Sequence, residues 1–240
     1  MRVGEVYELL DSISPFELQE SWDNSGLLLG EFSQDVKRVV LSVDIDANMV
    51  QEAQEHTLFV LHHPLIFSGL KSLKWDEYPA NILRDMVKKD HSVIAMHTNF
   101  DKTHLNRYVF EKVLGFKAKE CEEFICYAEG RWQSKELLEN IKRALSLDVM
   151  RVVGNKSEIR SVAMVTGAGA SLMDLADADL FLTGDIKFHD AMKGVSEGVM
   201  MADIGHFESE RHFADALGEN LKNLPIPVII AQSINPFTYI

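Results

Sequence analysis

Short apolar runs alternate with amphipathic stretches along the first half of the chain. Near the start, Val6, Leu9 and Ile13 recur at helical spacing, which predicts a helix that ends before Pro15. Beyond it, β-branched runs predict strands, and a helical pattern follows each run. The strands are expected at 38–43, 57–61 and 92–96, and the helices at 47–55, 79–89 and 105–114. Repeated alternation of strand and helix predicts an α/β fold with a mixed, largely parallel sheet.

The second half of the chain repeats this alternation and predicts a second α/β lobe. Its strands are expected at 124–129, 149–153, 159–165, 180–182, 198–202 and 227–231, and its helices at 134–145, 171–176, 186–193 and 207–222. No linker rich in Pro, Gly or Ser separates the halves. We therefore predict two lobes that meet near residue 124.

The composition narrows the class of protein. Charged residues make up 25% of the chain and the net charge is −13, without a basic cluster, so binding to nucleic acid is not expected. The first ten residues lack the apolar segment of a secretory signal, and no apolar run approaches the ~20 residues that span a bilayer. A cytoplasmic protein without membrane contact is therefore predicted. Cys121 and Cys126 are too sparse for a zinc site or a disulfide scaffold and are expected to be reduced thiols.

Polar clusters follow four of the predicted strands directly. They are His62-His63, His97 to Asp101, Thr183 to Asp185, and Asp203 to His206. In open α/β sheets, ligands bind beyond the carboxyl ends of the strands. Four of the nine histidines fall in these clusters, so we predict a functional site at this edge.

Each candidate ligand also has an ordinary structural interpretation. Neighbouring residues of a strand point to opposite faces, so His62 and His63 reach one cavity only if the chain bends; otherwise one is a core and one a surface histidine. His206 and Glu210 stand four residues apart, which places them on one helical face as metal ligands or as a solvated pair. Asp101 is either a ligand or the N-cap of the next helix.

Three further features of the strand ends have more than one interpretation from the sequence alone. His97 is a candidate ligand, a support for another ligand, or the catalytic group that transfers protons. The glycine turn Gly167 to Gly169 either holds a phosphate or allows tight strand-to-helix packing, since it lacks a full dinucleotide fingerprint. Asp185 and His189 either support metal ligands or belong to a helix start.

Taken together, these segments resemble the dinuclear-metal-centre (Nif-three-like) family, whose bacterial members are often called GTP cyclohydrolase 1 type 2 homologues. The matching segments appear in family order and cover most of the chain: 21–27, 62–64, 97–101, 167–169, 184–191 and 205–210. The chain is short between its lobes and lacks the long insertion of some relatives. Any function of that insertion is absent here.

The resemblance implies a ligand set, a fold and an assembly. The metal ligands of the family motifs fall on His62, His63, Asp101, His206 and Glu210, with Glu210 expected to bridge two divalent ions. It also implies a first lobe over 1–123, a second lobe over 124–204, and a segment 205–240 that returns to complete the first. Because members of this family resemble ring-shaped hexamers, a homohexamer is expected.

The donor types restrict the metal and the chemistry. Histidine nitrogens with carboxylate oxygens suit zinc, iron, manganese or cobalt rather than magnesium or calcium. The resemblance implies a hydrolase that converts GTP to dihydroneopterin triphosphate and formate. Two alternatives are a metal-dependent phosphohydrolase on nucleotides or phosphoesters, and a non-enzymatic metal-binding adaptor.

Overall fold

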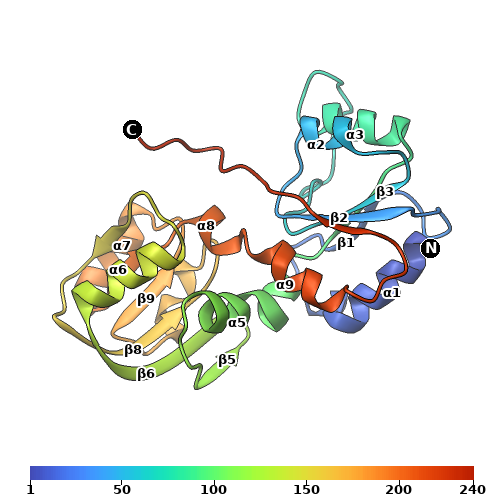
Figure 1. The fold of residues 1–240 in the computed structure, drawn as a ribbon. Coiled ribbons are helices and arrows are strands. Elements are labelled where there is room, and N and C mark those ends of the chain that lie inside the picture. The colour runs from blue at the N-terminus through green and yellow to red at the C-terminus, as the bar shows by residue number, and fades with distance from the viewer. The chain divides into compact units, whose positions relative to one another are not determined.

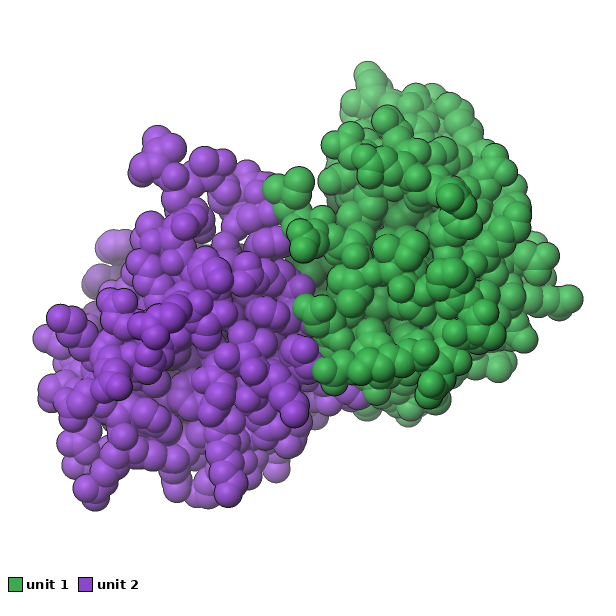
Figure 2. Space-filling view, viewed as in Figure 1, with its two compact units in different colours: residues 1–100, 213–234 green, residues 101–212, 235–240 purple.

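The computed structural model describes residues 1–240 and contains two compact units. Unit 1 consists of Met1–Phe100 with Phe213–Ile234, and unit 2 consists of Asp101–His212 with Asn235–Ile240 (Figure 2). The predicted lobes end at 123 and 204, so their limits differ from those of the two units. The predicted lobe limits stay a prediction. The fold class is α/β with mixed sheets in both units, as the sequence predicts.

Unit 1 is built on a five-stranded sheet with the order β1-β4-β3-β2-β11. Its strands are β1 (Gly26–Leu29), β2 (Arg38–Ser42), β3 (Thr57–Leu61), β4 (Ser92–Ala95) and β11 (Val228–Ile230) (Figure 1). All pairs are parallel except β1 with β4. Every residue of β3 and β4 is buried, as expected for central strands covered on both faces.

The helices of unit 1 follow the predicted pattern closely. They are α1 (Val3–Ile13), η1 (Phe16–Leu18), α2 (Ala47–Glu52), α3 (Ala80–Lys88), α4 (Thr98–Phe100) and α9 (Phe213–Asn220). In α1 the buried residues are Val3, Val6 and Leu10, which lie on one helical face. The predicted helix 207–222 is wrong as one element, because α8 (His206–Glu210) ends before α9 begins.

Unit 2 contains a six-stranded sheet with the order β5-β6-β8-β9-β10-β7. The strands are β5 (Glu120–Glu122), β6 (Ile125–Gln133), β7 (Arg151–Val153), β8 (Glu158–Met164), β9 (Leu180–Thr183) and β10 (Met200–Asp203). Only β8, β9 and β10 pair in parallel. The other helices are η2 (Asp101–Leu105), α5 (Asn106–Tyr108), η3 (Val109–Val113), α6 (Ser134–Ala144), η4 (Ala170–Leu175) and α7 (Phe188–Glu197).

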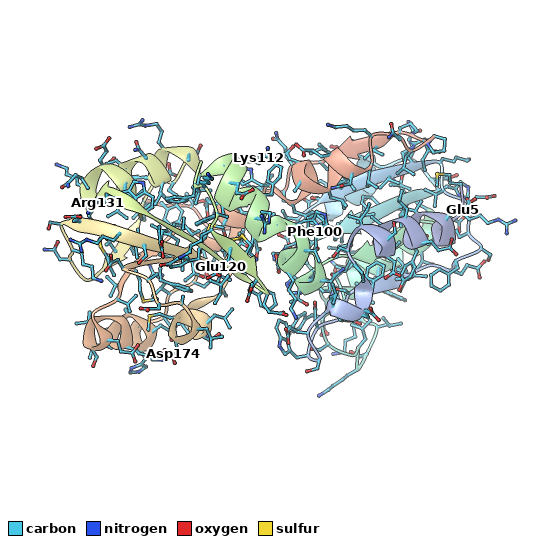
Figure 3. The ribbon with its side chains drawn as sticks, turned by 90° about the horizontal axis from the view of Figure 1, so that it is seen from below. Glu5, Phe100, Lys112, Glu120, Arg131 and Asp174 are labelled. Carbon is cyan, nitrogen blue, oxygen red and sulfur yellow. A yellow bond between two sulfur atoms is a disulfide. The ribbon has the colours of Figure 1, made fainter.

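Two local expectations in unit 2 are corrected. The strand β5, which begins at Glu120 (labelled in Figure 3), is missing from the sequence prediction, because its three residues carry no alternating pattern. Cys121 and Cys126 lie opposite each other in β5 and β6 and form a disulfide, so the expectation of reduced thiols is wrong. The spacing of two cysteines does not show that a hairpin places them face to face.

No helix in either unit combines the length and the apolar character that a membrane-spanning helix needs.

Candidate metal centre

Three histidines of unit 1 gather beyond the ends of β3 and β4. His62 and His63 follow β3, and their amides donate to the carbonyls of Ser42 and Val43 at 3.1 and 3.0 Å. His97 follows the neighbouring parallel strand β4. The chain bends after β3, so both rings of the His-His pair face the same region, with centroids 5.0 Å apart. The His97 ring lies 5.2 Å from the His62 ring and 5.7 Å from the His63 ring.

Each of these three rings is oriented by a hydrogen bond at Nδ1. The Nδ1 of His62 lies 3.0 Å from the carbonyl of Met96. The Nδ1 of His63 lies 2.8 Å from Asp44 Oδ1, and that of His97 lies 2.7 Å from Asp23 Oδ1. Carbonyl and carboxylate oxygens only accept, so Nδ1 donates in every pair. Metal-binding histidines are commonly oriented in this way, with Nδ1 on an oxygen acceptor.

Asp23 is the most strongly held of the supporting carboxylates. It also accepts hydrogen bonds from the amide and the hydroxyl of Thr98, at 3.1 and 2.5 Å, and from the amide of Asn24 at 2.7 Å. Burial by itself raises the pKa of this carboxyl, but the hydrogen bonds from His97 and Thr98 outweigh it and hold the pKa well below its usual range. The segment 21–27 therefore supports His97 with a permanent negative charge.

Aromatic rings surround the histidines of unit 1. Trp22 and Phe67 each lie 6.3 Å from the His97 ring, and Phe213 lies 5.1 Å from the His62 ring. His62 is fully buried, whereas the side chain of His97 is 16% exposed. Apolar surroundings restrict water and strengthen the electrostatic interactions of a bound ion.

Unit 2 brings together the other three predicted residues. His206 begins α8, and Glu210 follows one turn later, so that His206 Nε2 and Glu210 Oε2 are 3.0 Å apart. The Nδ1 of His206 is bonded to Asp185 Oδ2 at 2.7 Å, which makes Asp185 a support for this histidine. Carboxylate oxygens of Asp101 and Glu210 lie within 4.8 Å of each other, and both side chains are buried. Two buried carboxylates this close favour a cation between them.

The glycine turn of unit 2 makes room for Glu210. A Cβ on Gly167 would lie 2.0 Å from Glu210 Oε1, and its φ is +61°. The amide of Gly167 donates to Ser209 Oγ at 3.0 Å, and that of Gly169 donates to Thr183 Oγ1 at 2.8 Å. These two amides are already used, so neither is left to bind a phosphate. Close packing is the role that the structure supports.

The predicted residues thus form two sets, one in each unit. His62, His63 and His97 lie together in unit 1, whereas in unit 2 Glu210 lies close to both Asp101 and His206. His189 is exposed on α7 and takes no part. The sequence prediction missed Asp23 and Asp44. Asp44 lies two residues beyond the end of β2, and that position was the available signal.

Comparison with known proteins shows the family of this chain. The family described as Duf34/NIF3 (NGG1p interacting factor 3) matches residues 1–236 of the chain. The chain belongs to the DUF34/NIF3 family. The resemblance predicted from the motifs is therefore confirmed.

Other members of the family are similar over their full length. A Campylobacter jejuni protein named GTP cyclohydrolase 1 type 2 homolog is 46% identical, with 100% of both chains covered. A Helicobacter pylori protein named GTP cyclohydrolase 1 type 2 is 40% identical, with 99% of both covered. Among solved structures, a hypothetical protein of Staphylococcus aureus has a TM-score of 0.89 at 27% identity, covering 100% of this chain and 99% of that chain. The family fold therefore extends over both units.

Proposed function

We propose that this DUF34/NIF3 member is a metal-dependent hydrolase with two divalent ions bound by His62, His63, Asp101, His206 and Glu210. The observation that carries the proposal is the orientation of the histidines: three of these five residues are imidazoles whose Nδ1 is bonded to an oxygen acceptor, as is usual for metal-binding histidines. The donors suit zinc, iron, manganese or cobalt. Glu210 is the bridging ligand in this proposal, because it is buried and lies near both Asp101 and His206.

The bound ions would lower the pKa of a coordinated water and stabilise negative charge that develops on the substrate. The chain's own residues hold the rest of the site. Asp44 and Asp185 orient His63 and His206, and the aromatic rings near His97 exclude bulk water. The sequence predicts His97 as the group that transfers protons, and the hydrogen bond from its Nδ1 to Asp23 orients the ring for this role.

For the substrate, we propose GTP, opened to dihydroneopterin triphosphate and formate by a cytoplasmic enzyme. The support is the naming of the Campylobacter and Helicobacter relatives. We also propose that the chain assembles into a homohexamer. The support on this chain is a hollow of about 390 Å³ in unit 1, with exposed apolar side chains at Leu73, Trp75 and Val87.

The test is to load the protein with each candidate metal, add GTP, and measure formate together with neopterin fluorescence. We expect both products in equal amounts, and we expect their loss in His62→Ala and His206→Ala but not in the surface variant His189→Ala. Release of phosphate without formate would instead identify a phosphohydrolase. Two bound ions without any turnover would identify a metal-binding adaptor.

A further inference from the structure

Two exposed aromatic rings stand beside the histidines of unit 1. Trp22 is 58% exposed and Phe67 is 49% exposed, although large aromatic rings are mostly covered in folded proteins. They belong to two loops that are distant in the sequence. Their ring centroids are 6.2 Å apart, and each lies 6.3 Å from the centroid of the His97 ring. The protein thus keeps an aromatic pair at its surface next to the candidate metal centre.

The two loops are held in this arrangement before any ligand binds. The side-chain amide of Asn24 donates to the carbonyl of Ile66 at 2.5 Å, which joins the loop of Trp22 to the loop of Phe67. Asp23, the neighbour of Trp22, has no exposed side-chain surface, so this loop is also anchored in the interior. A ligand that meets the pair therefore loses little free energy in ordering the two rings.

The geometry of the pair fits a planar ring. The planes of Trp22 and Phe67 are inclined by 48°, so the two rings do not cover each other as a stacked pair would. A planar ligand can lie against the face of one ring and meet the other ring with its edge, and both contacts are favourable between aromatic groups. Nucleobases are planar and stack readily on aromatic side chains.

The position of the pair indicates which part of a nucleotide it would hold. In the proposed reaction, formate carries away a carbon atom of the guanine ring, so that ring must lie beside the ions. A phosphohydrolase would need the phosphates there instead, and phosphates are bound by cationic side chains and amides rather than by aromatic faces. Rings at 6.3 Å from His97 therefore favour a base next to the metal centre.

We propose that Trp22 and Phe67 form a binding site for a purine base at the candidate metal centre. The base stacks on Trp22, whose indole has the larger face, and meets Phe67 with its edge. This inference rests on the proposed function for the choice of a purine, and it deepens that function by naming the residues that bind the base. Neither side chain is a metal ligand, so both act on the binding and placement of the substrate.

The experiment measures the binding of guanosine, which has the base but no phosphate. Zinc-loaded protein is titrated with guanosine in a calorimeter, and inorganic triphosphate is the comparison ligand without a base. We expect guanosine to bind the wild type. Trp22→Leu should weaken guanosine binding by roughly 5- to 100-fold, as expected for the loss of a stacking side chain, and Phe67→Leu should weaken it less. Triphosphate should bind all three proteins equally.

Two further variants separate stacking from folding. Trp22→Phe keeps a ring and should retain most of the affinity, but it should lose the change in tryptophan fluorescence that guanosine causes in the wild type. Phe188→Leu is the matched control, because Phe188 is exposed and lies edge-on to a histidine ring, that of His189, at 5.5 Å on α7 of unit 2. It should leave guanosine binding unchanged. Circular dichroism shows that each variant is folded.

The inference is overturned if guanosine does not bind the wild type at millimolar concentration, or if it binds Trp22→Leu equally tightly. Equal weakening of guanosine and triphosphate in Trp22→Leu would also overturn it, because a stacking residue does not act on a phosphate chain. Failure of the proposed hydrolase function has a different signature. Guanosine would then bind and depend on Trp22, and no formate would be released from GTP.

Discussion

At the scale of single residues, the candidate site depends on the histidines and also on the oxygen atoms that accept hydrogen bonds from their Nδ1 atoms. His63, His97 and His206 are each bonded through Nδ1 to an aspartate, at 2.8, 2.7 and 2.7 Å. Such partners fix the tautomer and the orientation of a ligand ring and raise its basicity. The aspartates should therefore influence metal binding without touching the metal.

Asp185→Asn tests this in unit 2. The variant keeps the size of the side chain but removes the charge that orients His206. We expect metal affinity to fall by roughly 10- to 100-fold, with little change in thermal stability, because Asp185 is exposed. Isothermal titration with Zn²⁺ measures the affinity. An affinity equal to the wild type would show that His206 needs no such partner.

His91 should make unit 1 sensitive to acid. It is buried beside Thr57 and Phe59, and burial, with a smaller contribution from the Lys89 cation, lowers its pKa to about 4. The unfolded chain binds a proton near pH 6.5, so stability is lost as pH falls from about 6.5 toward 4. Between pH 7 and pH 5 the loss should be about 1 to 2 kcal/mol.

Urea unfolding at both pH values measures this loss, with His91→Gln as the variant that cannot titrate. The difference between pH 7 and pH 5 should be smaller in the variant by the contribution of His91. An equal difference in both proteins would show that another group carries the acid sensitivity.

At the scale of elements, the strand ends supply the histidines and a helix start supplies the glutamate. β3 and β4 are neighbouring parallel strands, so the residues that follow them meet at one edge of the sheet. In unit 2, β9 and β10 end near the turn that contains Gly167, and the carbonyl of Gly167 accepts from the amide of Gly184 at 2.7 Å. This contact places the turn against α8, where Glu210 lies.

Gly167→Ala should therefore displace Glu210. The new Cβ would meet Glu210 Oε1 at 2.0 Å, and φ is already positive at +61°. We expect the loss of at least one bound ion per chain, measured by metal analysis, and a lower melting temperature. Gly198→Ala is the matched control, because Gly198 has φ +72° and no atom near its Cβ position. It should cost stability from the positive φ alone and keep both ions.

At the scale of the whole molecule, unit 1 is assembled from two separate parts of the chain. β11 pairs in parallel with β2, so a strand near the end of the sequence completes a sheet begun near its start. Ala231 continues this pairing by donating to the carbonyl of Leu41 at 2.9 Å. Unit 1 therefore cannot complete its sheet from residues 1–100 alone.

The apolar hollow of unit 1 is the surface that we assign to self-assembly. Trp75 is 50% exposed beside it, and a charge at this position would be buried at a cost in any contact between copies. Trp75→Asp should shift the protein from a hexamer toward smaller species in light scattering coupled to size exclusion. Phe188→Asp, on exposed α7 in unit 2, is the control and should leave the mass unchanged. A monomeric wild type would contradict the proposed assembly.

The sequence by itself determined the α/β class, the order of most elements, and the strand-end positions of the histidines. These follow from local periodicity, since strands and helices repeat apolar residues at different intervals. The spacing of His206 and Glu210 likewise fixed their common helical face, which the structure confirms at 3.0 Å. Local patterns were sufficient for this pair because its two residues lie about one helical turn apart.

Only the tertiary structure decided which side chains orient the histidines. Asp23 reaches His97 across 74 positions of sequence, and Asp185 reaches His206 across 21. The disulfide and the room that Gly167 leaves for Glu210 also depend on how strands pair and turns close. The physical reason is that periodicity reports which face of an element is buried, whereas a contact between distant residues depends on the path of the whole chain.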